Sequence, residues 1–334
     1  MNSLPRFGAM LRISIMNRYS AMLLILACSL ILSSCSQGPK KEPGKIRIQL
    51  NWFPDSQHGG IYAALLNGHY EKEGLDVEII PGGPGVGVEA KVDLGRVEFG
   101  IANAHRILLK RNEGAKITAL FACLQNSPRC IMVHKESGIE KFEDLAGVTL
   151  AVGSDTAFYK YMQQKVELKN VKLVSYSGSN AAFLSDKSYA QQAYSISEPI
   201  LVKRKGANPV SLMLSDLGFN PYTSCVFASE KTVAENPEMV KKFLRATRKG
   251  WEDYVKNPES ANKEMEKINK EHDLQALNEG AMAARELCQP TSSTEIGSMT
   301  NERWSEIVSQ LQAIGMLKED FEMGKAYSTE YLPE

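Results

Sequence analysis

The sequence predicts an α/β fold in two parts. Short runs rich in β-branched residues alternate with helical patterns of crossover length, which is typical of largely parallel sheets. The 334 residues are enough for roughly two domains of about 150 residues each. After residue 230 the pattern turns wholly helical. We therefore expect two α/β units, the second of which is followed by further helices.

The first α/β unit begins near Ile46. Its strands are expected at residues 45–50, 76–80, 98–102 and 116–123. The intervening segments GGIYAALLNGHYEKEG, VGVEAKVDLGR and NAHRILLKRNEG have lengths suited to crossover helices. Two of them end at Gly74 and Gly114, where a helix C-cap favours a positive φ. The alternation predicts one set of βαβ units.

The second α/β unit follows without a long linker. Helices are predicted in FEDLAG, which ends at Gly147, in SDTAFYKYMQQKVE, where Ser154 or Asp155 can cap the N-terminus, and in EPILVKRKG. The unit closes with NPYTSCVFASE at residues 220–230. Its strands are expected at residues 129–135, 148–152, 171–176, 193–197 and 209–214.

The C-terminal region is predicted to be helical. Asn236 can cap a helix that has Pro237 at its first position, where the missing N–H of proline is tolerated. The apolar residues of this helix, from Val240 to Val255, fall on one face at helical spacing. Further helices are expected up to about residue 316.

The N-terminus has the order of a secretory signal. Arg18 precedes an apolar run at residues 21–32, and the motif LSSC ends at Cys35. A run of about twelve apolar residues is short for a bilayer span, which needs around 20. LSSC resembles the lipobox of bacterial lipoproteins, which implies a signal peptide at residues 1–34, lipid attachment at Cys35, and an exported protein anchored in the periplasm or at the outer face of the cytoplasmic membrane. Residues 35–45 are polar and rich in Gly, Pro and Lys, as in a tether.

Composition and spacing argue against several function classes. Lys plus Arg and Asp plus Glu both number 39, so no global charge indicates a nucleic-acid partner. The five histidines show no HxH or HExxH spacing, so no metal site is predicted, and no GxSxG elbow occurs. The body has no CxxC pair among its cysteines. Buried thiols and one bridge between Cys123 and Cys130 both remain open.

The segment GVGVEA at residues 85–90 has the form of a dinucleotide-binding fingerprint. It follows the second predicted strand rather than the first, and PGGPG makes the preceding loop longer than the tight fingerprint turn. A dinucleotide site is therefore disfavoured. A simple loop and a helix N-terminus that faces a ligand remain as alternatives.

Asn51 and Trp52 are the first candidate ligand residues. They follow the first predicted strand, and in open α/β sheets ligands bind beyond the carboxyl ends of strands. Trp52 offers a flat apolar wall, and Asn51 both donates and accepts hydrogen bonds. Glu198 and Pro199 open a helix, where the helix dipole favours a carboxylate, so Glu198 has either a structural or a ligand-binding role.

With these residues in view, the chain resembles the solute-binding proteins of ABC importers, in the branch that binds thiamine pyrimidine precursors and, in its relatives, alkanesulfonates, taurine or riboflavin. The resemblance covers about residues 46–260. It is carried by LNWFPDSQHGGIYAALLNGHYEKEGLDVEIIPGGPGV, GRVEFGIANAHRILLKRNEG, SISEP and NPEMVKKFLRATRKGW.

This resemblance implies a periplasmic-binding-protein type II fold, which has two α/β lobes with a hinge and a ligand cleft between them. Lobe I would comprise residues 46–124 and 226–334, and lobe II residues 125–225. A ligand held between the lobes would stabilise a closed state that the importer reads.

Carried over residue by residue, the resemblance implies a pocket lined by Asn51, Trp52, His58 and Glu198. A ring stacked on Trp52, with Glu198 accepting from a ring amine, would suit an aminopyrimidine, whereas a sulfonate would be repelled by that carboxylate unless an arginine offset it. We therefore expect a planar, nitrogen-containing ligand such as a thiamine pyrimidine precursor. Strand ends and helix starts add further candidates, namely Tyr62, Asn103, Ser154, Thr156, Tyr194 and Tyr222.

Other functions remain as alternatives. Related proteins bind taurine, alkanesulfonates, nitrate or riboflavin. Fungal thiamine-pyrimidine synthases are also similar, but Ala102 and Arg106 occupy the positions of their pyridoxal-phosphate lysine and of a histidine, and only Cys225 stands in the place of their cysteine-rich iron motif. The chain is therefore expected not to be an enzyme and to need no cofactor.

The expected partners follow from the same resemblance. They are the small ligand, the permease and ATPase of an ABC importer, and the membrane through the N-terminal lipid. The protein itself is expected to be a monomer. A tethered sensor that presents ligand to a receptor is a further alternative.

Overall fold

The computed structural model describes residues 44–153 and 157–333. The predicted signal peptide, Cys35 and the first residues of the predicted tether lie outside the described residues, as do Ser154 and Thr156. Within the described ranges, no helix combines the length and the apolar character needed to span a membrane.

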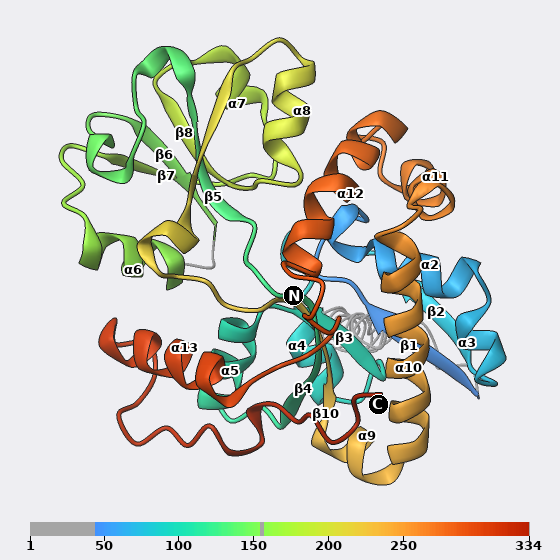
Figure 1. Ribbon diagram of the computed structural model, residues 1–334. Coiled ribbons are helices and arrows are strands. Elements are labelled where there is room, and N and C mark those ends of the chain that lie inside the picture. Colours follow the sequence, from blue (N-terminus) through green and yellow to red (C-terminus); the bar gives the residue numbers. More distant parts are fainter. Residues whose placement is uncertain (1–43, 154–156, 334) are drawn as a thin grey trace, which may run out of the picture. The chain divides into compact units, whose positions relative to one another are not determined.

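The first sheet corresponds to the first predicted α/β unit, and we call the elements built on it lobe I (Figure 1). Its strand order is β2-β1-β3-β10-β4. β1 runs parallel to β2 and β3, whereas β10 is antiparallel to β3 and β4. β2, β1, β3 and β4 thus run in one direction, as expected for a largely parallel sheet, and only β10, which returns from the second unit, runs against them. The strands are β1 (Lys45–Gln49), β2 (Asp76–Ile80), β3 (Phe99–Ala102), β4 (Ile117–Leu124) and β10 (Thr223–Ser229).

Both faces of this sheet are covered by helices. Along β10, Cys225 and Phe227 belong to the cluster that contains α4 and α5, while Val226 and Ala228 belong to the cluster that contains α2 and α10. This alternation is that of a strand buried on both sides. The helices are η1 (Ser56–His58), α2 (Gly59–Leu66), α3 (His69–Lys72), α4 (Val88–Asp93), α5 (Ala104–Asn112), α9 (Glu230–Glu235), α10 (Pro237–Tyr254), α11 (Glu259–Ile268), α12 (Leu274–Cys288), α13 (Asn301–Ala313) and η5 (Gly324–Ala326).

The helix predicted from Asn236 is α10, and its apolar face packs closely on α2. A Cβ added at Gly250 would overlap the carbonyl oxygen of Gly60, and a Cβ at Gly60 would overlap the ring of Trp251. Glycine at both positions lets the two helix backbones approach closely. This contact fixes α2, and with it the loop between β1 and α2, against the body of lobe I.

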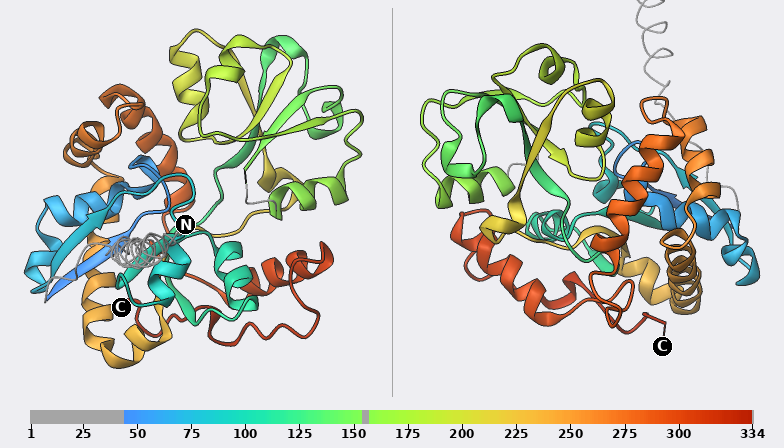
Figure 2. Two further views of the ribbon diagram at one scale, coloured as in Figure 1. Left: turned by 180° about the vertical axis from the view of Figure 1, so that it is seen from behind. Right: turned by 45° about the horizontal axis from the view of Figure 1, so that its top comes forward.

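The second sheet forms the second predicted unit, which we call lobe II (Figure 2). Its strand order is β7-β6-β8-β5-β9, with β6 parallel to β7 and β8, and β5 antiparallel to β8 and β9. The strands are β5 (Arg129–His134), β6 (Thr149–Val152), β7 (Lys172–Ser175), β8 (Tyr189–Tyr194) and β9 (Pro209–Met213). The helices are η2 (Lys135–Ser137), η3 (Phe142–Asp144), α6 (Ala157–Lys165), α7 (Ala181–Ser185), α8 (Glu198–Arg204) and η4 (Leu214–Leu217).

The strand predicted at residues 193–197 is misplaced. In the structure β8 ends at Tyr194, and the next three residues turn into α8. The position of this strand could not be predicted from apolar periodicity, because two of its buried residues are glutamines. Gln191 donates to the side chain of Asn180 at 2.8 Å, and Gln192 accepts from the backbone N–H of Gly153 at 2.6 Å. Each buried amide thus makes one side-chain hydrogen bond, which offsets part of the cost of burial, while Oε1 of Gln191 has no partner in the described structure.

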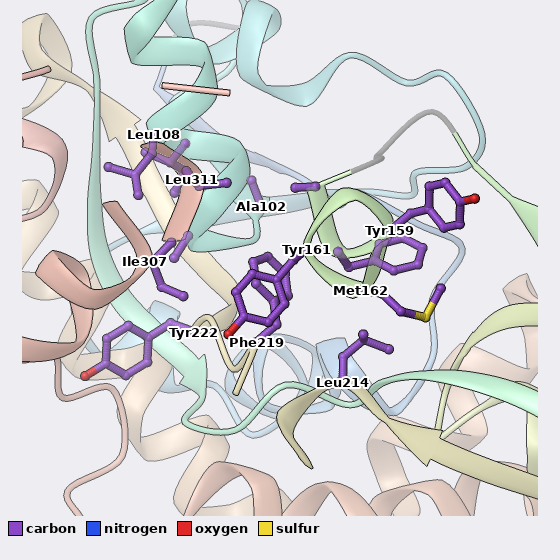
Figure 3. Packing of buried hydrophobic residues seen from close by; sticks show 14 of the residues in the cluster. Ala102, Leu108, Tyr159, Tyr161, Met162, Leu214, Phe219, Tyr222, Ile307 and Leu311 are labelled. Carbon is purple, nitrogen blue, oxygen red and sulfur yellow. The ribbon is translucent and has the colours of Figure 1, made fainter. Parts of the chain in front are cut away.

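Two segments connect the lobes, residues 125–128 from β4 to β5 and residues 214–222 from β9 to β10. Beside them the two lobes share one apolar cluster, in which the ring of Tyr161 lies 5.2 Å from that of Phe219 (Figure 3). Helix α13 packs against both α5 and α6 there. The cluster also contains Ala102, Leu108, Met162, Leu214, Tyr222, Ile307 and Leu311.

Candidate functional site

A cavity of about 280 Å³ is lined by residues of both lobes. Lobe I contributes the segments that follow β1, β2 and β3, and lobe II contributes those that follow β6, β7 and β8. The cavity therefore lies at the carboxyl ends of the parallel strands in both sheets, which is the usual place for ligands in open α/β folds. Its walls combine aromatic rings, amides and charged groups.

Trp52 forms the flat wall on the lobe I side. Its ring meets the ring of Phe53 edge to face, with centroids 5.6 Å apart. Gly178 of lobe II lies against the edge of the same ring, so that an added Cβ would stand 3.4 Å from Cη2 of Trp52. Gly82 donates from its N–H to the carbonyl oxygen of Trp52 at 3.0 Å. The backbone of Trp52 is thus fixed by the loop that follows β2.

Asn51 is held by a buried histidine behind it. Nε2 of His58 lies 2.8 Å from Oδ1 of Asn51, and Nδ1 of His58 lies 3.4 Å from Oδ1 of Asp55. Asp55 also caps η1, since its carboxylate accepts from the backbone N–H and side-chain amide of Gln57 at 3.1 and 3.2 Å. These contacts order the wall segment from Asn51 to Gln57.

The pKa of Asp55 reflects two opposing effects. Burial acts to raise the pKa of this carboxyl, but the hydrogen bond and charge of His58, together with the charge of His272 and the amide of Gln57, bring it below its ordinary value. The carboxylate form is therefore the stable one in the folded protein. An ionised carboxylate therefore lies on this wall of the cavity at neutral pH, beside the imidazole of His58.

Glu198 supplies a carboxylate from the lobe II side. Oε2 accepts from the backbone N–H of Tyr194 at 2.8 Å, and Oε1 accepts from the hydroxyl of Tyr176 at 3.0 Å. Burial raises the pKa of Glu198 above its ordinary value, although the N–H of Tyr194 and the charge of Arg129 act in the opposite direction. The group is thus poised to titrate closer to neutrality than an exposed glutamate.

Two arginines also line the cavity. Nε of Arg106 lies 3.0 Å from Oε1 of Glu89, so the two charges form an ion pair. The guanidinium of Arg129 lies over the ring of Tyr194 at 4.4 Å and over the ring of Phe158 at 5.1 Å. Both cations are therefore engaged with lining or neighbouring side chains.

The structure brings five of the predicted ligand residues together on the cavity wall, namely Asn51, Trp52, Asn103, Tyr194 and Glu198. His58 does not line the cavity itself but is hydrogen-bonded to Asn51, which does. Tyr62 and Tyr222, which the sequence also suggested as ligand residues, do not line this cavity. Tyr62 is buried among apolar residues of α2 and α10, and the hydroxyl of Tyr222 accepts from the backbone N–H of Thr300 at 3.0 Å. Ser154 and Thr156 lie outside the described residues.

Other lining residues were not selected from the sequence. Tyr176 is the last residue of the strand predicted at residues 171–176 and directly follows β7 in the structure, so the strand-end rule that selected Asn51 could have found it. Arg129 begins a strand, and no local signal marks it as a ligand residue. The further unselected wall residues with polar side chains are Asp55, Gln57, Glu89, Arg106, Gln192 and Ser197.

The segment GVGVEA forms part of the wall as a loop and a short helix. Gly85 and Gly87 have φ angles of 74° and 60°, and α4 begins at Val88 and spans only six residues. Both glycines line the cavity. The segment is half loop, at residues 85–87, and half helix start, at residues 88–90, so it combines the two alternatives left open by the sequence. Glycine adopts the positive φ angles of the loop half without steric cost.

The cysteines of the described residues are free and buried, so the bridge considered between Cys123 and Cys130 is not formed. Burial raises the pKa of Cys130 and of Cys225 to about 12. These thiols therefore stay protonated and pack as small apolar groups. Within the described residues, no group of three or more His, Cys, Asp or Glu side chains is arranged to hold a metal ion.

Comparison with known proteins places the chain in context. A family model described as NMT1/THI5 like matches residues 55–261. The riboflavin-binding protein RibY of Chloroflexus aurantiacus is 22% identical over 93% of this chain and 95% of its own length. The formylaminopyrimidine-binding protein of Halalkalibacterium halodurans is 23% identical over 94% of this chain and 99% of its own length. A 4-amino-5-hydroxymethyl-2-methylpyrimidine phosphate synthase of Legionella pneumophila is 25% identical over 65% of this chain and 71% of its own.

Solved structures support the same fold. The periplasmic aliphatic sulphonate-binding protein SsuA of Escherichia coli superposes with a TM-score of 0.67 and 13% identity, covering 88% of this chain and 94% of that one. The two-lobe type II periplasmic-binding-protein fold expected from the sequence is thereby confirmed.

Proposed function

The chain belongs to the NMT1/THI5-like family, and from this premise we propose that it is an extracytoplasmic solute-binding protein. It captures a small, planar, nitrogen-containing ligand of the thiamine pyrimidine precursor type and delivers it to an ABC importer. The observation that carries the proposal is the pairing of a flat aromatic wall, Trp52 of lobe I, with a carboxylate, Glu198 of lobe II, in one cavity.

The wall of Trp52 favours a planar ligand. A flat ring gains dispersion and stacking contact over the indole face at a small entropic cost. Because Gly178 of lobe II lies against the edge of the indole, the stacked ring is enclosed when the lobes are closed. Such burial from both sides stabilises the closed state only when ligand is present.

Glu198 favours a ligand that donates hydrogen bonds. The hydroxyl of Tyr176 and the backbone N–H of Tyr194 each donate to one oxygen of its carboxylate and so fix the orientation of the group. The lone pairs that remain free to accept from a ligand therefore point in directions set by the protein. An exocyclic amine or a protonated ring nitrogen supplies the matching donor. A sulfonate would place an anion near the carboxylates of Glu198 and Asp55. Of the two arginines on the wall, Arg106 is already paired with Glu89, and the charge of Arg129 already acts on Glu198.

The cavity wall also supports a binding rather than a catalytic role. Ala102 lies on this wall at the position where the similar synthases carry the lysine that binds pyridoxal phosphate. A methyl group cannot form a Schiff base, so the chemistry of that lysine is missing here. Because no lysine among the described residues lines the cavity, incubation with one equivalent of pyridoxal phosphate, borohydride reduction and peptide mapping should find no saturable adduct at the cavity. Adducts on exposed lysines are expected of any protein, and a saturable adduct at the cavity would revive the enzyme alternative.

Anchoring and delivery complete the proposal. Cys35 is the lipid-attachment residue, and closure of the lobes is the signal that the importer permease reads. Metabolic labelling with an alkyne fatty acid should mark the wild-type protein and not a Cys35→Ala variant. If the Cys35→Ala variant is labelled equally and stays in the membrane fraction, Cys35 is excluded as the lipid-attachment residue.

Native mass spectrometry of protein purified without refolding tests the ligand class. A co-purified mass that matches an aminopyrimidine, or a thermal shift with 4-amino-5-hydroxymethyl-2-methylpyrimidine, supports the proposal, because a ligand that binds only the folded state raises its stability. Shifts with taurine, an alkanesulfonate, nitrate or riboflavin alone would assign the protein to one of those ligands instead. Stabilisation by an aminopyrimidine without any effect on an importer would favour the tethered sensor.

A further inference from the structure

Ser224 stands in an unusual backbone conformation next to the cavity. In the described part of the chain, only Asn170 and Ser224 are non-glycine residues with positive φ, and Ser224 has a φ of 53°. It is fully buried at the start of β10, directly after the second connection between the lobes. A serine in this region carries a conformational cost that the surrounding contacts must offset.

Two contacts hold Ser224 in this conformation. Its backbone N–H donates to Oδ1 of Asn103 at 3.2 Å, and its hydroxyl donates to Oε1 of Gln57 at 3.1 Å. Both acceptors are side chains of the cavity wall. The unusual backbone of Ser224 thus directs two donors toward residues of the site, although Ser224 itself does not line it.

The contact continues from Asn103 to the other lobe. Nδ2 of Asn103 donates to the hydroxyl of Tyr194 at 2.8 Å. Asn103 precedes α5 in lobe I, whereas Tyr194 ends β8 in lobe II. This bond can exist only when the two lobes approach each other. Three hydrogen bonds therefore form a chain, which runs from Gln57 to Ser224, from Ser224 to Asn103, and from Asn103 to Tyr194.

We propose that Ser224 is a positioning residue that couples the connection between the lobes to the ligand site. In the closed form its N–H and hydroxyl orient the amides of Asn103 and Gln57, and Asn103 holds Tyr194. When the lobes separate, Asn103 loses Tyr194, and the support for the left-handed backbone of Ser224 weakens. This inference rests on the proposed function, because the walls concerned are those of the proposed ligand cleft.

Three variants separate the parts of this coupling. Ser224→Ala removes the hydroxyl and keeps the cost of the left-handed backbone, whereas Ser224→Gly removes the hydroxyl and relieves that cost. Asn103→Ala removes the acceptor of the backbone N–H and the bond to Tyr194. Ser229→Ala is the matched control, because Ser229 is also a buried serine of β10 but caps α9 at the opposite end of the strand.

The first readout needs no ligand. Spin labels on Lys72→Cys in lobe I and Lys172→Cys in lobe II, both exposed positions, report the distance between the lobes in the purified full chain. We expect Ser224→Ala and Asn103→Ala each to increase the population of molecules with separated lobes. Because both changes break the same chain of contacts, the double variant Ser224→Ala/Asn103→Ala should increase this population no more than the larger of the two single changes. Ser224→Gly should show a smaller increase, and Ser229→Ala should match the wild-type protein.

The second readout is affinity for 4-amino-5-hydroxymethyl-2-methylpyrimidine. Loss of one neutral hydrogen bond predicts a decrease of about 3- to 10-fold for Ser224→Ala, with a smaller decrease for Ser224→Gly. Wild-type lobe distances in both Ser224 variants, or additive effects of Ser224→Ala and Asn103→Ala, would overturn the inference. Failure of the wild-type protein to bind the pyrimidine would count against the proposed ligand, while the ligand-free distances still decide the role of Ser224.

Discussion

The hydroxyl of Tyr176 donates to Oε1 of Glu198 at 3.0 Å, while the backbone N–H of Tyr194 donates to Oε2 of the same carboxylate at 2.8 Å. The three residues come from the ends of β7 and β8 and the start of α8. The carboxylate is therefore oriented before any ligand arrives. Such preorganisation lowers the entropic cost of binding, because the acceptor need not be ordered by the ligand.

Removing the Tyr176 hydroxyl should weaken binding without unfolding lobe II. Tyr176→Phe keeps the ring and deletes one donor to Glu198, so affinity for an aminopyrimidine should fall about 2- to 10-fold. The pKa of Glu198 should rise further, because a donor to the ionised carboxylate is lost. Calorimetric titration at several pH values measures both effects. Unchanged affinity and pH dependence would show that Tyr176 does not orient Glu198.

Glu198 predicts a specific dependence of stability on pH. Burial raises the pKa of Glu198 in the folded state above the ordinary value of 4.5, which applies to the unfolded chain. At a pH between the unfolded and the folded pKa, the folded protein therefore retains a proton that the unfolded chain has lost. The free energy of unfolding should therefore fall as pH rises through this window, and the loss should be absent in Glu198→Gln. Urea denaturation of both proteins from about pH 4 to about pH 8 measures the difference. Parallel curves for the two proteins would contradict the raised pKa.

Arg204 of α8 forms an ion pair across the lobes. One guanidinium nitrogen lies 2.6 Å from Oδ2 of Asp273, and another lies 3.6 Å from Oε1 of Glu279 on α12. Arg204→Ala should accelerate ligand release by up to about 5-fold, and less at high salt, because exposed pairs contribute about 0–1 kcal/mol. Stopped-flow release measured at two salt concentrations tests this.

The control for Arg204 is Arg245→Ala. Arg245 forms a bidentate pair with Glu73 at 2.7 and 2.6 Å, and both residues belong to lobe I. Its loss should leave the release rate unchanged. Equal release rates for all three proteins would mean that the Arg204 pair does not act on lobe closure.

Close packing between α10 and α2 should make Gly250 sensitive to substitution. The methyl group of Gly250→Ala would collide with the backbone of Gly60 and with Ala64, so the free energy of unfolding should decrease by about 1–3 kcal/mol. Lys249→Ala, an exposed change on the same helix, should alter it by less than about 0.5 kcal/mol. Urea denaturation compares the two. A stable Gly250→Ala variant would show that the helices can separate without cost.

The α/β alternation and the C-terminal helices could be predicted from the sequence because their apolar periodicity is strong. The direction of β10 could not, because NPYTSCVFASE reads the same whether its strand runs parallel or antiparallel to its neighbours. The end of β8 was misplaced because Gln191 and Gln192 interrupt the apolar pattern of a buried strand, and their partners, Asn180 and Gly153, are set only by the folded chain.

Part of the candidate site could also be predicted. Asn51, Trp52 and Glu198 carry local signals, a strand end and a helix start, and all three line the cavity. Tyr62 carries a helix-start signal too, but it lies inside α2 and is buried in the apolar cluster that α2 forms with α10. Arg129 and Ser224 could not be found, because the role of each depends on residues distant in sequence.

The most direct measurement is calorimetric titration of 4-amino-5-hydroxymethyl-2-methylpyrimidine into wild-type protein and into Trp52→Ala and Glu198→Ala variants, with Leu94→Ala, an exposed change, as control. We expect one-site binding by the wild-type and control proteins. Loss of stacking should weaken binding about 10- to 100-fold in Trp52→Ala, and loss of the carboxylate should have an effect of similar size. Wild-type affinity in both variants, with their fold retained, would contradict the assignment of this cavity as the ligand site.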